Sequence, residues 1–278
     1  MELQNVVTLL KKEIHDSLNN RWFVLYAAAF TGLSLLLSWL SLSGGGTGFS
    51  GFAGFGRTAA SLINLVLLII PLMGLTLGAG SLSGEAERGT LAYLLAQPVN
   101  RAEVLLGKYL GLAASLLGTL AFGFGVSGFI IARRGGQTDV GAYGWLVLLA
   151  FILALAMLSL GVLISAFTRK TTVATGAALL VWLTLVFVGD LGLMSTAIVF
   201  RIPIRLLFRL ALLNPLQVFK MSALLNINAT LDVLGPAGIY AMQTYQNNLN
   251  LLLGIVLAAW IVLPLLAAHL IFLKRVDL

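Results

Sequence analysis

Six long runs of apolar residues constrain the fold of this chain more than any other feature. They are Trp22–Leu42, Ala59–Leu82, Val104–Ala132, Trp145–Phe167, Val173–Phe200 and Leu249–Leu273. A bilayer core about 30 Å thick is crossed by about 20 apolar residues, because a helix rises about 1.5 Å per residue. The mean hydropathy of the whole chain is +1.01, far above that of soluble domains. The sequence therefore predicts an all-α membrane protein with six transmembrane helices.

The first 21 residues have the pattern of a helix that lies on the membrane. Apolar residues recur every three or four positions, at Leu3, Val7, Leu10, Ile14 and Leu18, with charged residues between them. Residues 1–21 are expected to form an interfacial helix, which either orients the first span or contacts a partner inside the cell. Residues 22–278 are expected to form one transmembrane domain, whose long connection is residues 201–248.

The charge of the chain indicates its topology. Lysine and arginine number 17 against 10 aspartate and glutamate residues, a net charge of +7. In membrane proteins an excess of basic residues marks the cytoplasmic loops. More of the lysines and arginines fall inside when both termini are placed in the cytoplasm, so we expect that orientation.

Catalytic and cofactor-binding patterns are missing from the sequence. There is no cysteine, and His15 and His269 are far apart along the chain. No G-x-x-x-x-G-K-[ST] motif occurs, since Gly107–Lys108 is followed by Tyr109 and lacks the upstream glycine. We expect no catalytic residue, no metal site and no cofactor, and therefore a chain that is not itself an enzyme.

The segment from Ser83 to Lys108 concentrates charge between the second and third spans. It holds Glu85, Glu87, Arg88, Arg101 and Glu103, although only 10% of the chain is charged. A soluble partner could exert force on such a segment at the membrane surface.

Helix signals occur at both ends of this segment. Ser83 and Gly84 are expected to end the second span, and Glu85 and Glu87 suit the first turn of a new helix. A helix through Thr90–Ala96 would stop at Gln97–Pro98. Asn100 with Glu103 three residues later predicts a capping box at the start of the next helix. The sequence thus predicts a short helix held between two membrane helices.

Two polar features remain in the second half of the chain. Asp190 is the only acid inside a predicted span, and it either lines a cavity or reaches the membrane interface. Arg201, Arg205 and Arg209 are spaced four apart and form one basic stripe on a short helix. The stripe fits lipid headgroups or an acidic patch on an extracytoplasmic protein.

The charged segment resembles that of the ABC-type-2 permeases, in which Gly-Glu-x-Glu-x-Gly-Thr-Leu is followed by Pro-x-x-Arg and Leu-Leu-Gly-Lys. The matching residues are Gly84, Glu85, Glu87, Gly89, Thr90, Leu91, Pro98, Arg101, Leu105, Leu106, Gly107 and Lys108. The resemblance implies a homodimer in the inner membrane of a bacterium or archaeon, working with two copies of a subunit that binds ATP. It also implies a coupling helix within loop 83–108, with ATPase coupling through Glu85, Glu87, Arg88, Gly89, Thr90, Pro98 and Arg101.

A narrower resemblance rests on Trp182, Asp190 and the string Leu213-Asn214-Pro215. These residues are similar to those of the permeases that serve the maturation of nitrous oxide reductase. Related chains carry tyrosine and arginine where this chain has Phe219 and Lys220. The resemblance implies a periplasmic β-helical partner and a role in supplying copper or sulfur to the copper centres of that enzyme.

Two other functions stay open from the sequence. One is a general ABC exporter of a lipid or another hydrophobic compound. The other is an ATP-independent secondary transporter or a membrane anchor. A secondary transporter usually needs a midplane charge and broken helices, and Asp190 alone offers the charge.

Overall fold

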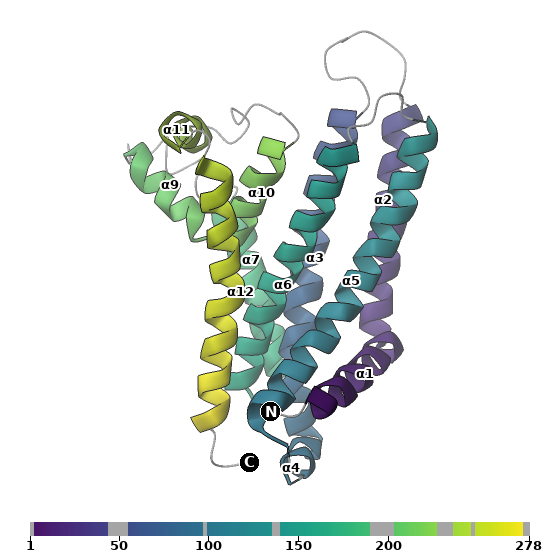
Figure 1. Ribbon diagram of the computed structural model, residues 1–278, viewed down its shortest axis with the longest axis vertical. Helices are drawn as coiled ribbons and strands as arrows, with labels where there is room; N and C mark the ends of the chain where they lie inside the picture. The colour runs from purple at the N-terminus through teal and green to yellow at the C-terminus, as the bar shows by residue number, and fades with distance from the viewer. Residues whose placement is uncertain are drawn as a thin grey trace.

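The computed structural model describes residues 3–43, 55–96, 99–134, 140–189, 203–226, 236–245 and 248–274, which form helices joined by short turns (Figure 1). Five helices are long and apolar enough to cross a membrane. They are α2 (Arg21–Ser43), α3 (Phe55–Glu87), α5 (Arg101–Arg134), α6 (Val140–Phe167) and α12 (Leu249–Lys274). The prediction of an all-α membrane protein is confirmed.

The fifth predicted span begins as α7 (Thr171–Phe187), an apolar helix of 17 residues that lies within the bundle. The rest of that predicted span, residues 190–200, lies outside the described residues. The five long helices and α7 correspond in order to the six predicted apolar runs.

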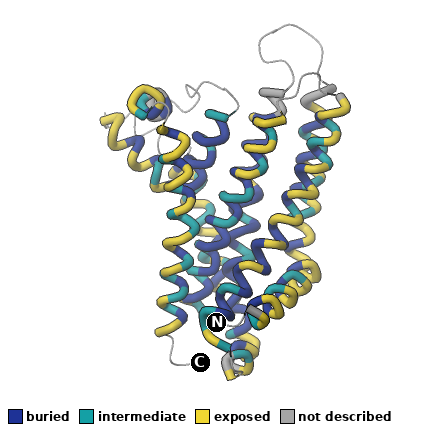
Figure 2. The backbone as a smooth tube through the Cα atoms, viewed as in Figure 1, coloured by how far each residue is buried: buried dark blue, intermediate teal, exposed yellow. Residues whose placement is uncertain are grey.

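The centre of the bundle is the contact between α3 and α6, which Figure 2 shows as the most continuously buried part of the molecule. Glycines allow the two backbones to approach closely. A Cβ atom on Gly78 would lie 2.5 Å from the carbonyl oxygen of Leu158, and one on Gly74 would lie 2.9 Å from that of Ala154. The helices α3 and α6 therefore form the rigid axis on which the other spans pack.

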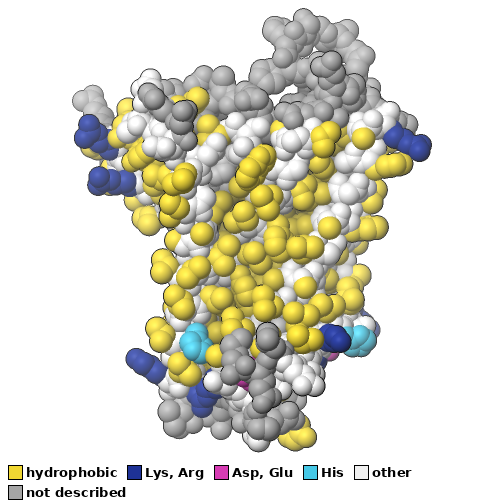
Figure 3. Space-filling view, in the orientation of Figure 1, with side chains coloured by type: hydrophobic (Ala, Val, Ile, Leu, Met, Phe, Trp, Pro, Cys, Tyr) yellow, Lys and Arg dark blue, Asp and Glu magenta, His cyan; other side chains and the backbone are white. Residues whose placement is uncertain are grey.

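Short helices occupy both ends of the bundle. At one end lie α1 (Leu3–Asn19), α4 (Thr90–Leu95) and the last turn of α12; we call this the α4 end (Figure 1). At the other lie α9 (Ile204–Leu212) and α11 (Pro236–Tyr245), with α10 (Pro215–Asn226) descending into the bundle. A broad hydrophobic band separates the charged side chains of the two ends (Figure 3). The molecule thus has the dimensions and surface of a membrane-spanning bundle.

The helix α1 lies obliquely across the α4 end and packs mainly against α5, not α2. Its buried positions are Val6, Leu9, Glu13 and Ser17. Val7 and Leu18, which belong to the predicted apolar stripe, are exposed on another side of the helix. The helix α1 lies within the segment predicted to be interfacial, and a carboxylate and a hydroxyl share its buried face, which the apolar pattern did not predict.

Candidate functional site: the helix junction around α4

The carboxylates of Glu85 and Glu87 lie in the last turn of α3, and the prediction that they begin a new helix is wrong. The helix continues through Ser83, whose hydroxyl donates to the carbonyl oxygen of Ala79, 2.5 Å away, within the same helix. It ends where Gly89 adopts a φ of 71°, a left-handed conformation that glycine takes without strain. Acidic groups at a helix C-terminus are disfavoured by the helix dipole, so they need cationic or N–H partners nearby.

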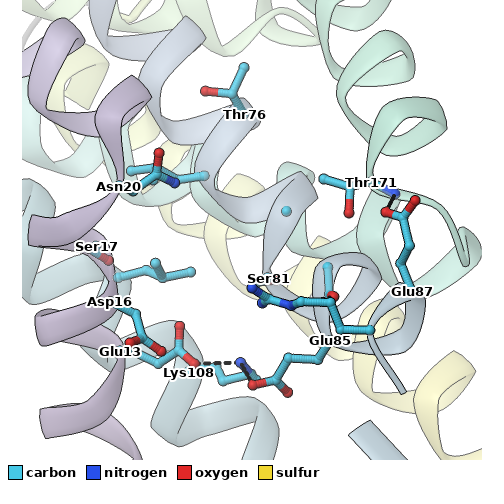
Figure 4. A pocket seen from close by; sticks show the side chains of 15 residues that line it. Glu13, Asp16, Ser17, Asn20, Thr76, Ser81, Glu85, Glu87, Lys108 and Thr171 are labelled. Atoms are coloured by element: carbon cyan, nitrogen blue, oxygen red, sulfur yellow. Dashed lines mark hydrogen bonds and ion pairs between the residues drawn. The ribbon is translucent and has the colours of Figure 1, made fainter. Parts of the chain in front are cut away.

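Glu85 finds its partners in a buried ion cluster (Figure 4). Its Oε1 atom lies 2.9 Å from Nζ of Lys108 and 2.9 Å from Nζ of Lys12. Lys108 also donates a short hydrogen bond to Glu13. The side chains of Lys108 and Glu85 are only 3% and 5% exposed. This cluster, formed by Lys12, Glu13, Glu85 and Lys108, ties α1, α3 and α5 together at one point.

Lys12 closes the cluster on its outer side, where its side chain is 46% exposed. Partial burial by itself would lower the pKa of its ammonium group, but the hydrogen bond to Glu85 and the charges of Glu85, Glu13 and Asp16 outweigh burial. The pKa of Lys12 is therefore raised, and this lysine stays charged at neutral pH.

Two contacts flank α4 and reach the remaining spans. On one side Oε2 of Glu87 accepts a hydrogen bond, 2.8 Å long, from the backbone N–H of Thr171, the first residue of α7. On the other side Nη1 of Arg101 donates to the carbonyl oxygens of Phe272 and Leu273, at 2.9 and 3.0 Å, in the last turn of α12. A carboxylate at a helix N-terminus and a guanidinium at a C-terminus both suit the helix dipole. Both residues were predicted for the site.

The helix α4 presents one side to the bundle and another to solvent. Leu91 is fully buried, and the hydroxyl of Thr90 donates to the carbonyl oxygen of Glu85 at 3.3 Å. Arg88 donates through Nε to the carbonyl oxygen of Gly84, 3.0 Å away. Tyr93, at 74% exposure, extends away from the bundle. Among the predicted site residues Pro98 lies outside the described part of the chain.

The predicted capping box at the start of α5 is confirmed. The backbone N–H of Asn100 donates to Oε2 of Glu103 at 3.2 Å, and Oδ1 of Asn100 accepts from the N–H of Ala102 at 3.3 Å. Glu103 also accepts a hydrogen bond from the Asn5 amide of α1, 3.2 Å away. The cap therefore fixes both the start of α5 and its contact with α1.

At the opposite end of the bundle α9 exposes Arg205 and Arg209, whereas Arg201 and Asp190 lie outside the described residues. The ring of Phe208 anchors α9 on α11 through Tyr240 and Tyr245, with centroids 6.0 and 5.5 Å away. The two arginines that the structure describes thus lie on a helix held in place by aromatic packing.

The string Leu213-Asn214-Pro215 joins α9 to α10. Asn214 accepts from the N–H of Leu216 at 3.0 Å and donates to the carbonyl oxygen of Leu185 in α7 at 2.6 Å. Trp182, one turn earlier in α7, has a buried indole nitrogen without a partner among the described residues. Asn214 therefore caps the start of α10 and connects it to α7.

Comparison with known proteins identifies the family to which the chain belongs. The family model described as "ABC-2 family transporter protein" matches residues 7–278. The chain belongs to this family. It is 30% identical over 282 residues to the "Probable ABC transporter permease protein NosY" of Stutzerimonas stutzeri, covering 99% of this chain and all of that protein. The protein of the same name from Pseudomonas aeruginosa is also 30% identical, covering 97% of this chain and 98% of its own.

Membership makes the chain a permease subunit of an ABC transporter, and the family implies a partner subunit that binds ATP. Sequence reasoning missed the permease's ion cluster, because Glu13 and Lys108 are 95 residues apart. It also missed Tyr93. A signal for Tyr93 was present, since an exposed tyrosine in a short surface helix is an unusual use of a large side chain.

Proposed function

We propose that this permease converts ATP hydrolysis on a separate cytoplasmic subunit into movement of its transmembrane helices, with α4 as the coupling helix. The supporting observation is the set of contacts around α4. The chain itself joins α4 to α3 and α5, Glu87 reaches the start of α7, and Arg101 reaches the end of α12. A displacement of α4 would therefore act on four membrane helices together.

The side of α4 on which the ATP-binding subunit would act follows from which side packs against the bundle and which side is exposed. On its inner side Leu91 is buried and α4 packs on α3, which the ion cluster joins to α1 and α5. Tyr93 projects outward and offers a large amphipathic contact of the kind enriched at the centres of protein interfaces. We place the ATP-binding subunit against this side, with both termini of the permease in the cytoplasm and ATP bound only by that subunit.

We further propose a homodimer in the inner membrane that serves copper-site assembly in nitrous oxide reductase. The full-length similarity to two proteins named NosY supports this specialisation. The exposed Arg205 and Arg209, on a helix packed firmly against α11, offer a surface for a β-helical protein docked on the periplasmic side.

The test uses the permease co-expressed with the ATP-binding subunit that co-purifies with it, identified by mass spectrometry. Replacing Tyr93 with alanine is expected to weaken capture of that subunit about tenfold, the loss typical of one interface aromatic. Phe122→Ala, an exposed aromatic in the middle of α5, is the matched control and should leave capture unchanged.

A second variant separates binding from coupling. Arg101→Met removes both hydrogen bonds to α12 but leaves α4 and Tyr93 in place. It should retain the ATP-binding subunit but no longer support the ATP-driven maturation of nitrous oxide reductase. Normal capture by Tyr93→Ala together with normal maturation by Arg101→Met would reject the assignment of α4.

A further inference from the structure

A polar cavity of about 340 Å³ lies between α1, α3 and α7 at the α4 end (Figure 4). Its back wall is α3, where Gly80 and Gly84 leave room, and its two sides carry Asp16 of α1 and Thr171 of α7. The coupling contacts described above border this cavity but do not fill it. The proposed coupling role of α4 therefore does not account for this cavity.

The charges of the cavity wall favour a cation. Four carboxylates line it, those of Glu13, Asp16, Glu85 and Glu87, against the two cations Arg88 and Lys108. Lys108 is already paired with Glu13 and Glu85, and Lys12, which is not part of the wall, is paired with Glu85, so the carboxylates still outnumber the cations by one. Asp16 is exposed and has no comparably close ion pair among the described residues, so it offers the most accessible negative charge.

Two buried polar atoms of the wall have no hydrogen-bond partner among the described residues. They are Oγ of Ser17 and Oε2 of Glu85, and both side chains are at least nine-tenths buried. Burial of an unpaired polar atom is unfavourable, so such an atom calls for a hydrogen-bonding partner. They add a second observation, independent of charge, that this wall is built to hold a hydrogen-bonding group.

The position of the cavity points to a lipid headgroup. Asn20 lines the cavity, and Trp22, two residues later, is 68% exposed at the start of α2. Exposed tryptophans at the ends of membrane helices mark the level of the headgroups. Leu77 and Leu112 also line the cavity, so its surface joins apolar surface on α3 and α5.

The chemistry of the wall selects among headgroups. Quaternary ammonium groups are recognised by aromatic cages, and none of the described residues that line the cavity is aromatic. A primary ammonium donates hydrogen bonds that carboxylates accept. Arg88 uses Nε for Gly84, which leaves its Nη groups for a phosphate. The excess of carboxylates disfavours an anionic headgroup.

We propose that the cavity binds the headgroup of phosphatidylethanolamine from the leaflet on the α4 side. Asp16 accepts hydrogen bonds from its ammonium group, and Arg88 binds its phosphate. This inference does not depend on the coupling role of α4, because it concerns lipid occupancy and not ATP hydrolysis.

The experiment uses the full chain, purified from vesicles that contain equal amounts of dioleoyl phosphatidylethanolamine and dioleoyl phosphatidylcholine. Native mass spectrometry counts the lipids that stay bound. We expect phosphatidylethanolamine to be enriched about fivefold, the gain from one charge-assisted hydrogen bond at a partly exposed site. Equal retention of the two lipids would overturn the proposal.

Variants locate the site. Asp16→Asn and Arg88→Gln should each abolish most of the enrichment, whereas Lys11→Gln, on an exposed position of the same helix, should preserve it. Enrichment that survives both cavity variants would place the lipid elsewhere and overturn the assignment. A further arm adds free ethanolamine and measures thermal stability. Stabilisation by free ethanolamine equal to that by the lipid would assign the cavity to a soluble cation, against the proposal.

Discussion

Lys108 is the residue on which the α4 end depends most heavily. It lies between Glu13 and Glu85 at 3% exposure and pairs with both carboxylates, whose side chains are only 8% and 5% exposed. The other cation of the cluster, Lys12, is 46% exposed and pairs with the same Oε1 atom of Glu85. The positive charge of Lys108 therefore contributes more to the stability of the protein than the positive charge of Lys12.

Replacing Lys108 with methionine is expected to destabilise the protein by about 3–5 kcal/mol, because it leaves buried carboxylates without their cation. Lys12→Met is the matched control and should cost less than about 1 kcal/mol, as exposed ion pairs do. Thermal unfolding in detergent, followed by loss of the monodisperse chromatographic peak, measures both. Similar losses for the two variants would show that Lys108 is not buried as described.

Residue roles were predictable where the partners are close along the chain. The capping pair Asn100 and Glu103 follows from a spacing of three and is confirmed. The partner of Glu85 could not be predicted, because helix packing sets its distance from Lys108 and no sequence spacing does. The prediction that Glu85 and Glu87 begin a helix was wrong for a related reason. Sequence rules consider only the dipole of the local helix, whereas the partners of these carboxylates come from α1, α5 and α7.

At the scale of elements, the contact between α1 and α5 is made by two glycines one helical turn apart. A Cβ atom on Gly107 would lie 2.7 Å from Cβ of Leu9. A Cβ atom on Gly111 would lie 2.6 Å from Cβ of Glu13 and 2.9 Å from the carbonyl oxygen of Leu10. No real Cβ atom tolerates such distances, so these glycines set how closely α1 can approach α5.

Gly111→Ala should therefore force α1 away from α5 and cost about 1–3 kcal/mol, the usual penalty of overpacking. Gly118→Ala is the control on the same helix, since a Cβ atom there would meet nothing within 4 Å. It should be neutral or slightly stabilising, because alanine has the higher helix propensity. Thermal stability and protease sensitivity of α1 report the difference, and equal behaviour of the two variants would contradict the packing of α1.

Helices as elements were well predicted, since apolar length fixes the spans, and α4 occupies Thr90–Leu95, within the predicted range Thr90–Ala96. Boundaries were less so: the sequence placed the end of the second span at Ser83–Gly84, but α3 continues to Glu87. Glycine inside a membrane helix is tolerated where neighbours pack closely, so Gly84 was a weak stop signal and Gly89 was the effective one.

At the scale of the whole molecule, the side of the bundle formed by α7 is largely exposed. Of the 17 residues of α7 only Ala174 and Ala178 are buried, and the helix exposes the side chains of Thr172 and Thr184. Hydroxyl groups are less suited to lipid than to a protein contact. This is the face on which the proposed second copy would pack.

The absence of cysteine from the sequence permits a direct test of the dimer. Leu180→Cys places a single thiol on the exposed side of α7, and oxidation of membranes should give a cross-linked dimer. Phe122→Cys, on α5 with similar exposure, should remain monomeric under the same conditions. Cross-linking of the Phe122 variant alone would move the interface to α5, and cross-linking of neither would argue against a homodimer.

The dependence of α1 on α5 also has a consequence for biosynthesis. The helix α1 leaves the ribosome before α5, on which it mainly packs, and the carboxylate of Glu13 is paired with Lys108 of α5, 95 residues later in the chain. At translation rates of about 5–20 residues per second, α1 waits for at least several seconds beside the translocon before its docking surface exists. Closure of the α4 end therefore cannot precede the synthesis of α5, and its contact with α12 forms later still, because α12 is the last described helix to be made.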